Sequence, residues 1–122
     1  MKSIELAEKI IRILDAKKAD DIVTLDIGGQ TSLADYFVIA SGKNTTLVKT
    51  LAEEIEEKLS GIGIEPRRIE GASSCMWILM DYSDVIVHVF YSETRDFYCL
   101  ERLWADASRV DVQKLLQDGS QK

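Results

Sequence analysis

The sequence predicts a single α/β domain of the α+β kind, in which helices pack on a mixed β-sheet of about five strands. Three observations support this fold class. The chain has 122 residues, which is the usual size of one domain. Its composition, 46% hydrophobic and 30% charged with a single proline, is that of an ordinary globular protein. Segments of helical and of strand-like periodicity alternate along the chain, as in a sheet covered by helices.

The first half of the chain predicts two helices separated by two strands. Apolar residues recur at helical spacing over 3–18. The β-branched run 21–27 stops at a pair of glycines and predicts a strand followed by a turn. The run 36–40 is continuously apolar, as a central strand covered on both faces should be. Apolar residues step by four over 47–59, and Gly61 suits the left-handed position that often closes a helix.

The second half predicts three strands and a third helix. A short strand over 67–70 precedes two longer strands, 75–81 and 84–91, which are joined by a tight turn. Apolar residues at helical spacing over 92–104 then predict a helix. The remainder contains a weak helical patch around Val112 and a polar end.

The chain shows no internal repeat and no linker that would divide it. Residues 1–108 are therefore predicted to form one domain, and residues 109–122 a C-terminal tail that is partly mobile. A formal net charge of −6 argues against nucleic acid, including direct DNA contact, and suits a basic partner such as a ribosomal protein. The apolar runs are too short for a membrane span, and the N-terminal segment has no continuous apolar signal-peptide core. We expect no membrane association and a cytoplasmic location.

The loop 41–46 lies between a predicted strand and a predicted helix, where backbone amides favour anions. Its Gly42-Lys43 pair suggests a phosphate-binding loop. That motif requires a glycine five residues earlier and Ser or Thr after the lysine, but these positions hold Phe37 and Asn44. We favour a capped strand-to-helix turn.

Acidic, histidine and cysteine residues give little support for catalysis. Asp81 and Asp84 flank the hairpin turn and are better explained by turn chemistry than by a metal or acid–base pair, because the sequence nominates no third ligand. His88 is the only histidine, and a Cys75–His88 pair would lack a visible orienting group and oxyanion hole. Cys75 and Cys99 are expected to be free thiols. We expect no metal, no cofactor, no small-molecule substrate and no enzymatic activity.

The hairpin 75–91 is the most informative segment. A two-residue turn at Tyr82-Ser83 would pair Asp81 with Asp84, Leu79 with Ile86, Trp77 with His88 and Cys75 with Phe90. One face of the hairpin would then be purely apolar: Met76, Ile78, Met80, Val85, Val87 and Val89. The other would mix aromatic, titratable and aliphatic side chains: Trp77, Leu79, Asp81, Asp84, Ile86, His88 and Phe90. The mixed face has the composition of a binding surface, although helices on both faces would simply bury Trp77.

Four segments resemble one known family: 34–42 (ADYFVIASG), 70–71 (EG), 77–90 (WILMDYSDVIVHVF) and 98–104 (YCLERLW). Together they resemble the ribosomal silencing factor family, the bacterial and organellar Iojap-related proteins, over about residues 3–108. The resemblance implies a nucleotidyltransferase-like α/β fold without transferase activity, and commonly a homodimer.

The resemblance also implies a function. Proteins of this family repress translation: they bind the large ribosomal subunit through its fourteenth protein and sterically block joining of the small subunit, which lowers translation under nutrient limitation. The implied contact residues are Trp77, Leu79, Asp81, Tyr82, Asp84 and His88, with Asp35 and Tyr36 nearby. Two alternatives stay open, a nucleotidyltransferase-type enzyme and a homodimeric scaffold that does not bind ribosomes. Ser83 departs from the family's DYGD-type turn, which has glycine at this position. Serine fits a positive φ less well than glycine, so this departure bears on the geometry of the turn.

Overall fold

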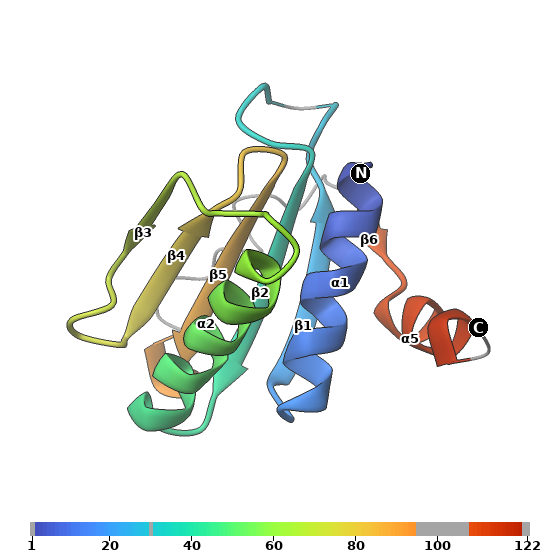
Figure 1. The fold of residues 1–122 in the computed structure, drawn as a ribbon. Helices are drawn as coiled ribbons and strands as arrows, with labels where there is room; N and C mark the ends of the chain where they lie inside the picture. Colours follow the sequence, from blue (N-terminus) through green and yellow to red (C-terminus); the bar gives the residue numbers. More distant parts are fainter. Residues whose placement is uncertain (1, 30, 95–107, 121–122) are drawn as a thin grey trace.

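The structure, a computed structural model, describes residues 2–29, 31–94 and 108–120, and side chains as far as residue 117. It confirms the predicted fold class: helices pack on a mixed sheet, which has six strands in the order β3-β4-β5-β2-β1-β6 (Figure 1). The elements are α1 (Ser3–Ala16), β1 (Asp20–Asp26), β2 (Tyr36–Gly42), α2 (Thr45–Ser60), β3 (Arg68–Glu70), β4 (Trp77–Asp81), β5 (Val85–Tyr91), β6 (Ser108–Val110) and α5 (Val112–Ser120). Among these strands β2 and β5 run parallel, and every other neighbouring pair is antiparallel.

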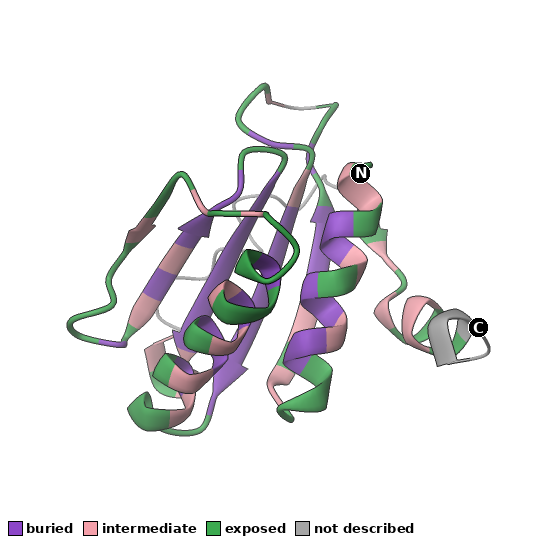
Figure 2. Cartoon of the chain, in the orientation of Figure 1, coloured by how far each residue is buried: buried purple, intermediate pink, exposed green. Residues whose placement is uncertain are grey.

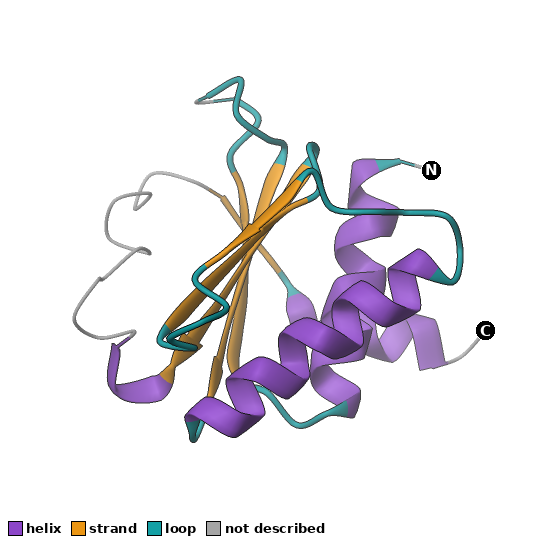
Figure 3. Cartoon of the chain, turned by 60° about the vertical axis from the view of Figure 1, so that its left-hand side comes forward, coloured by secondary structure: helices purple, strands orange, loops and turns teal. Residues whose placement is uncertain are grey.

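Helices α1, α2 and α5 lie on the same side of the sheet (Figure 3). The apolar faces of α1 and α2 pack against β2, β4 and β5 and form the larger of two hydrophobic clusters, which we call the helix-side core. Its strand residues include Val38, Val87 and Val89, all fully buried (Figure 2). This layer follows from the helical and strand periodicities of the sequence, because each element buries one apolar face.

Helix α2 differs from the prediction at its C-terminus. Gly61 has a right-handed conformation, with φ −61°. The left-handed residue is Gly63, with φ +83°, and the amide of Ile64 then donates to the carbonyl of Leu59 at 2.8 Å. The prediction of a left-handed residue at Gly61 was therefore wrong by two residues, although Gly61 is the C-cap of α2, because two glycines follow the helix and sequence alone does not decide between them.

The segment that follows residue 107 contributes to the fold. Strand β6 pairs with β1 and adds a sixth strand that the sequence analysis missed. In α5, Val112, Leu115 and Leu116 pack against the helix-side core, and the Arg12 guanidinium donates to the carbonyl of Leu115 at 2.8 Å. The predicted boundary between residues 108 and 109 falls within β6. The sequence of β6 shows no alternation of apolar and polar residues, because the strand has only three residues. Its pairing with β1 identifies it as a strand, and that pairing cannot be read from the local sequence.

The third predicted helix, 92–104, lies mostly outside the described residues. Residues 92–94 are helical, and the Ser92 hydroxyl donates to the carbonyl of Gly42 at 3.0 Å. Cys99 also lies outside the described residues, whereas Cys75 is a free and buried thiol as predicted.

Candidate functional site

The turn of the β4–β5 hairpin is displaced from its predicted position. Trp77 pairs with Phe90 and Leu79 with His88, so the register differs by two residues from the predicted one. The two turn residues are Ser83 and Asp84 instead of Tyr82 and Ser83, because the Tyr82 amide donates to the carbonyl of Val85 at 3.0 Å. A shift of two residues keeps every side chain on its face, because side chains alternate with a period of two.

The geometry of this turn accounts for Asp81 and Ser83. Ser83 has φ +72°, the positive value for which glycine is better suited. The amide of Ser83 donates to Asp81 Oδ1 at 2.8 Å, and the amide of Asp84 donates to the carbonyl of Tyr82 at 2.9 Å. Asp81 therefore acts as a turn residue, as the sequence analysis expected.

The two predicted faces of the hairpin exist. Ile78, Met80, Val85, Val87 and Val89 are buried in the helix-side core, as predicted. Met76 was assigned to the same face, but it precedes β4 and is 45% exposed, so this part of the prediction was wrong. The other face of the hairpin lies on the side of the sheet opposite α1 and α2, where Phe90 and Ile86 join a second hydrophobic cluster. We call this side of the sheet the mixed face.

Four of the eight predicted contact residues come together on the mixed face: Trp77, Leu79, Asp81 and His88. Asp35 and Asp84 lie at the end of the sheet beside them, because the Asp35 amide donates to the carbonyl of Asp84 at 2.8 Å. Both carboxylates are exposed.

The other two predicted contact residues lie on the helix side. Tyr82 is buried in the helix-side core, where burial and the nearby Glu56 and Glu65 raise the pKa of its phenol. Tyr36 packs partly against the same core. Both tyrosines are therefore separated by the sheet from Trp77 and His88.

Trp77 and His88 form the polar centre of the mixed face. Trp77 Nε1 donates to His88 Nδ1 at 3.1 Å, although the two residues are diagonal neighbours and not directly opposite as predicted. Trp77 also stacks on Phe90, with ring centroids 5.0 Å apart, and Phe37 meets His88 edge-on at 4.8 Å. Because indole can only donate, His88 Nδ1 must be unprotonated, and in the neutral ring Nε2 carries the proton.

Burial keeps the His88 ring neutral and leaves one of its ring nitrogens without a hydrogen-bond partner among the described residues. Its side chain is 4% exposed, and burial lowers its pKa from 6.5 to about 4, so the ring is neutral at pH 7. Within the described residues Nε2 has no hydrogen-bond partner. A buried donor without an acceptor costs about 1–3 kcal/mol, but Nε2 is closed to solvent, so an acceptor reaches it only when the side chains around it move.

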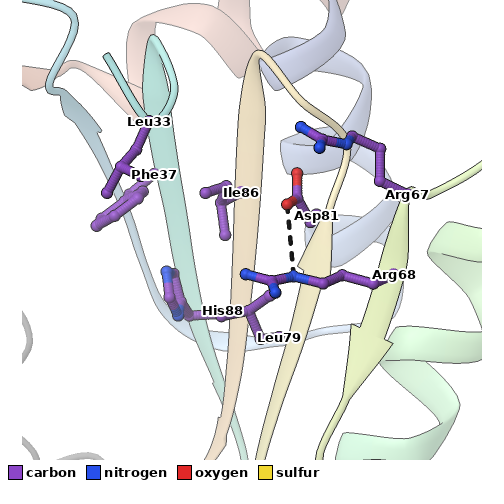
Figure 4. Close-up of a pocket in the computed structure, with 8 residues that line it drawn as sticks. All are labelled: Leu33, Phe37, Arg67, Arg68, Leu79, Asp81, Ile86 and His88. Carbon is purple, nitrogen blue, oxygen red and sulfur yellow. Dashed lines mark ion pairs between the residues drawn. The ribbon is translucent and has the colours of Figure 1, made fainter. Parts of the chain in front are cut away.

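A pocket of about 430 Å³ opens beside His88, and we call it the His88 pocket. Eight of the described residues line it: Leu33, Phe37, Arg67, Arg68, Leu79, Asp81, Ile86 and His88 (Figure 4). They come from β2, β3, β4 and β5, and from the segments that precede β2 and β3. Leu33 is 65% exposed at this pocket and presents an apolar surface to solvent.

Two arginines line the His88 pocket, and they differ in whether their charge is paired within the protein. Arg68 Nε lies 3.6 Å from Asp81 Oδ2 and 3.6 Å from a Glu70 carboxylate oxygen, so its charge is compensated within the protein. Arg67 is exposed and forms no ion pair with any other described residue, while its backbone amide donates to the carbonyl of Asp81 at 2.7 Å. Arg67 therefore leaves one positive charge available at the pocket.

Gly71 supports the position of Trp77. It has φ +84°, and a Cβ at this position would lie 2.0 Å from the Trp77 carbonyl oxygen. Only glycine allows the backbone to approach this closely, so Gly71 permits the loop before β4 to pass directly under the strand. The Glu70-Gly71 pair noted in the sequence thus has a structural role at the site.

The described residues offer little for metal or nucleophilic chemistry. They contain no group of three or more His, Cys, Asp or Glu residues that would hold a metal ion. Cys75 belongs to the helix-side core and His88 to the opposite face, so the two do not form a pair. Asn44 Oδ1 accepts from the Leu47 amide at 2.8 Å, which gives the loop before α2 the predicted role of a helix cap. Within the same residues no helix is long and apolar enough to cross a bilayer.

Sequence analysis missed four pocket residues: Leu33, Phe37, Arg67 and Arg68. Arg67 and Arg68 were visible as an adjacent basic pair on a short strand, but the pairing of that strand with β4 was not. Phe37 reaches the pocket through the parallel pairing of β2 with β5, which joins segments about 50 residues apart and leaves no local signal.

Comparison with known proteins places the chain in a family. The family model described as ribosomal silencing factor during starvation matches residues 1–122. The chain belongs to the ribosomal silencing factor family. A ribosomal silencing factor of Bacillus subtilis is 41% identical over 98 residues, which cover 80% of this chain and 83% of that protein. The mouse protein named mitochondrial assembly of ribosomal large subunit protein 1 is 26% identical over 100 residues, 80% of this chain and 44% of its own.

A solved structure supports the fold of this chain. A crystal structure of a protein from Chromobacterium violaceum superposes with a TM-score of 0.83 at 36% sequence identity, and the match covers 86% of this chain and 88% of that one. The resemblance of the four sequence segments is therefore confirmed at the level of family and fold.

Proposed function

We propose that this protein represses translation by binding the large ribosomal subunit through the mixed face of its sheet and sterically blocking the small subunit from joining. Membership of the ribosomal silencing factor family carries the proposal. The name of the mouse relative, which refers to the large ribosomal subunit, supports the choice of subunit. The fourteenth protein of that subunit is the proposed attachment point, and lower translation under nutrient limitation is the proposed outcome.

The composition of the mixed face supports its role as the docking surface. Trp77 is partly buried beside His88, and Leu33 projects from the loop before β2. Aromatic anchors and exposed apolar side chains around a pocket are the features that dominate binding energy at protein interfaces. An interface of standard size would bury about 800 Å² on each partner, so it must extend beyond the pocket over the ends of the neighbouring strands.

The proposed mechanism is steric and requires neither a cofactor nor a reaction. Occupying the intersubunit surface of the large subunit is sufficient to exclude the small subunit. The protein should therefore act at stoichiometric amounts and reversibly, and added nucleotide or magnesium should not alter its effect beyond their effects on the ribosome itself.

Leu33 and Ile62 provide a matched pair for testing the docking face. Leu33 is 65% exposed at the His88 pocket, and Ile62 is 54% exposed in the loop after α2, away from the mixed face. Leu33→Asp should weaken co-sedimentation with isolated large subunits and restore subunit joining, measured by light scattering. Ile62→Asp should do neither, since both residues are exposed and both variants should fold.

Three outcomes would contradict the proposal in different ways. Loss of binding with Ile62→Asp alone would move the docking surface to the helix side. Binding of the wild-type chain to small subunits would change the target. Self-association in sedimentation without any binding to ribosomal subunits would favour the homodimeric scaffold.

A further inference from the structure

We propose that the His88 pocket binds a carboxylate, the side chain of an aspartate or glutamate presented by the docked protein. This inference rests on the proposed function for the presence of a docked protein, while the pocket's preference for a carboxylate is tested without ribosomes. It assigns a role to the Arg67 guanidinium, which has no ion pair among the described residues, and to the unmet Nε2 donor of His88.

His88 has an unmet donor. The Trp77 indole occupies Nδ1 and leaves the proton on Nε2, which is buried and has no acceptor among the described residues. The His88 side chain lines the pocket beside Phe37 (Figure 4). Since Nε2 is closed to solvent, an acceptor oxygen bound at this wall completes the hydrogen bonding of the ring only when the neighbouring side chains move aside, whereas a second donor would be repelled.

The pocket also carries one uncompensated positive charge. Arg68 lies 3.6 Å from both Asp81 and Glu70, so these three charges already interact within the protein, and His88 is neutral. Arg67 forms no ion pair with any other described residue, although the whole chain carries −6. A single carboxylate would pair with Arg67, whose guanidinium offers a fork of donors that suits two carboxylate oxygens.

The walls of the pocket combine apolar and polar surface. Half of its described lining residues are apolar: Leu33, Phe37, Leu79 and Ile86. The methylene groups of a glutamate or aspartate side chain suit these walls, while its head reaches the donors. A nucleic-acid phosphate is bounded by sugars on both sides, and the strongly acidic chain repels a polyanion, so a protein carboxylate fits better.

The intrinsic preference of the pocket can be measured by NMR on the isolated protein. We expect propionate, a carboxylate on a short apolar stem, to shift the ring nitrogens of His88 and the Arg67 guanidinium resonances in a saturable way. Inorganic phosphate and a short single-stranded RNA at matched ionic strength serve as the other two probes. Arg67→Gln should abolish the propionate response, whereas Lys49→Gln, which removes an exposed positive charge from α2 on the opposite side of the sheet, should preserve it.

Each NMR result decides the question. A saturable propionate shift that depends on Arg67 supports the pocket. Saturation by phosphate or RNA but not by propionate would assign the pocket to a phosphate group and overturn the carboxylate. A linear drift with every probe would show general ionic effects and overturn the pocket as an anion site.

The same variants test the pocket in the complex. Arg67→Gln should weaken binding to large subunits by roughly 10-fold or more, because a hydrogen-bonded charge would lose its partner. Lys49→Gln, which removes an exposed positive charge from α2 on the opposite side of the sheet, should change binding by less than about threefold. Wild-type affinity for Arg67→Gln, together with lost binding for Leu33→Asp, would overturn the pocket and leave the proposed function standing. Failure of the wild-type chain to bind any subunit would overturn the proposed function, and the propionate titration would still decide the pocket.

Discussion

The two faces of the central hairpin differ in what they bury, although the same two strands supply both. On the helix side, alternate residues such as Ile78, Val87 and Val89 are aliphatic and completely or almost completely buried. On the mixed face, the intervening positions hold Trp77 and His88, which form a hydrogen bond to each other at the edge of an open pocket. Each face keeps a buried polar atom without a partner among the described residues, the Tyr82 hydroxyl on the helix side and His88 Nε2 on the mixed face. The mixed face differs because its polar atom belongs to the lining of a pocket that also carries Arg67, which has no ion pair among the described residues.

This contrast separates stability from recognition. A core gains from complete burial and from the absence of polar groups, because each buried polar atom must find a partner. A binding surface gains from groups that are satisfied only when the partner arrives. Substitutions on the helix side should therefore lower the free energy of unfolding. Substitutions on the mixed face should lower the free energy of unfolding less, and they should weaken binding to the partner more.

The largest effect is expected in the helix-side core. Leu51 is completely buried in α2, so Leu51→Ala should lower the free energy of unfolding by about 3–5 kcal/mol, measured by urea denaturation. Leu79→Ala removes the same atoms from a half-buried position on the mixed face and should cost roughly 1–2 kcal/mol. An equal loss of unfolding free energy in Leu51→Ala and Leu79→Ala would show that the two faces contribute equally to stability. The difference between a stabilising face and a binding face would then not hold.

The helix-side core could be predicted from sequence because its information is local. Periodicity over α1, α2 and the hairpin identifies which residues point inward, and a register error of two residues does not move them. The position of the turn was missed because Asp81, Ser83 and Asp84 all suit a turn, and the serine occupies the positive-φ position that glycine would have marked.

The pocket could be predicted only in part, because most of its geometry is non-local. Leu79, Asp81 and His88 belong to the hairpin and were identified together. Phe37 and Arg68 arrive through β2 and β3, whose positions in the sheet depend on strand order. Tyr82 was placed on the contact surface by its position in a family motif, yet it lies in the helix-side core, since neighbours along a strand point to opposite faces.

The next effect is a pH dependence that belongs to the mixed face. The pKa of His88 falls from 6.5 in the unfolded chain to about 4 in the folded one, so the unfolded chain binds the proton first as the pH drops. The neutral ring's contribution to stability is complete above pH 6.5 and is lost as the pH falls through 4. The loss amounts to roughly 3 kcal/mol, and urea denaturation between pH 7 and pH 4 measures it.

His88→Gln isolates this contribution, because it keeps a polar side chain and removes the titration. The variant should show a shallower decline of stability between pH 6.5 and pH 4 than the wild-type chain. Parallel pH profiles for the two proteins would mean that His88 titrates normally, and the mixed face would then be more open to water than the structure indicates.

The smallest effect concerns the Trp77–His88 hydrogen bond itself. Trp77→Phe keeps an aromatic ring against Phe90 but removes the Nε1 donor, so it should lower the free energy of unfolding by about 1–2 kcal/mol. A double-mutant cycle with His88→Gln separates the hydrogen bond from the lost ring area, and the coupling should be about 0.5–1.5 kcal/mol. The ring nitrogens of His88 give an independent readout: in wild type the proton stays on Nε2, whereas in Trp77→Phe the two tautomers should mix. A single Nε2 tautomer in both proteins, with no coupling energy, would mean that Trp77 does not orient the imidazole, and the donor assigned to the pocket would need another origin.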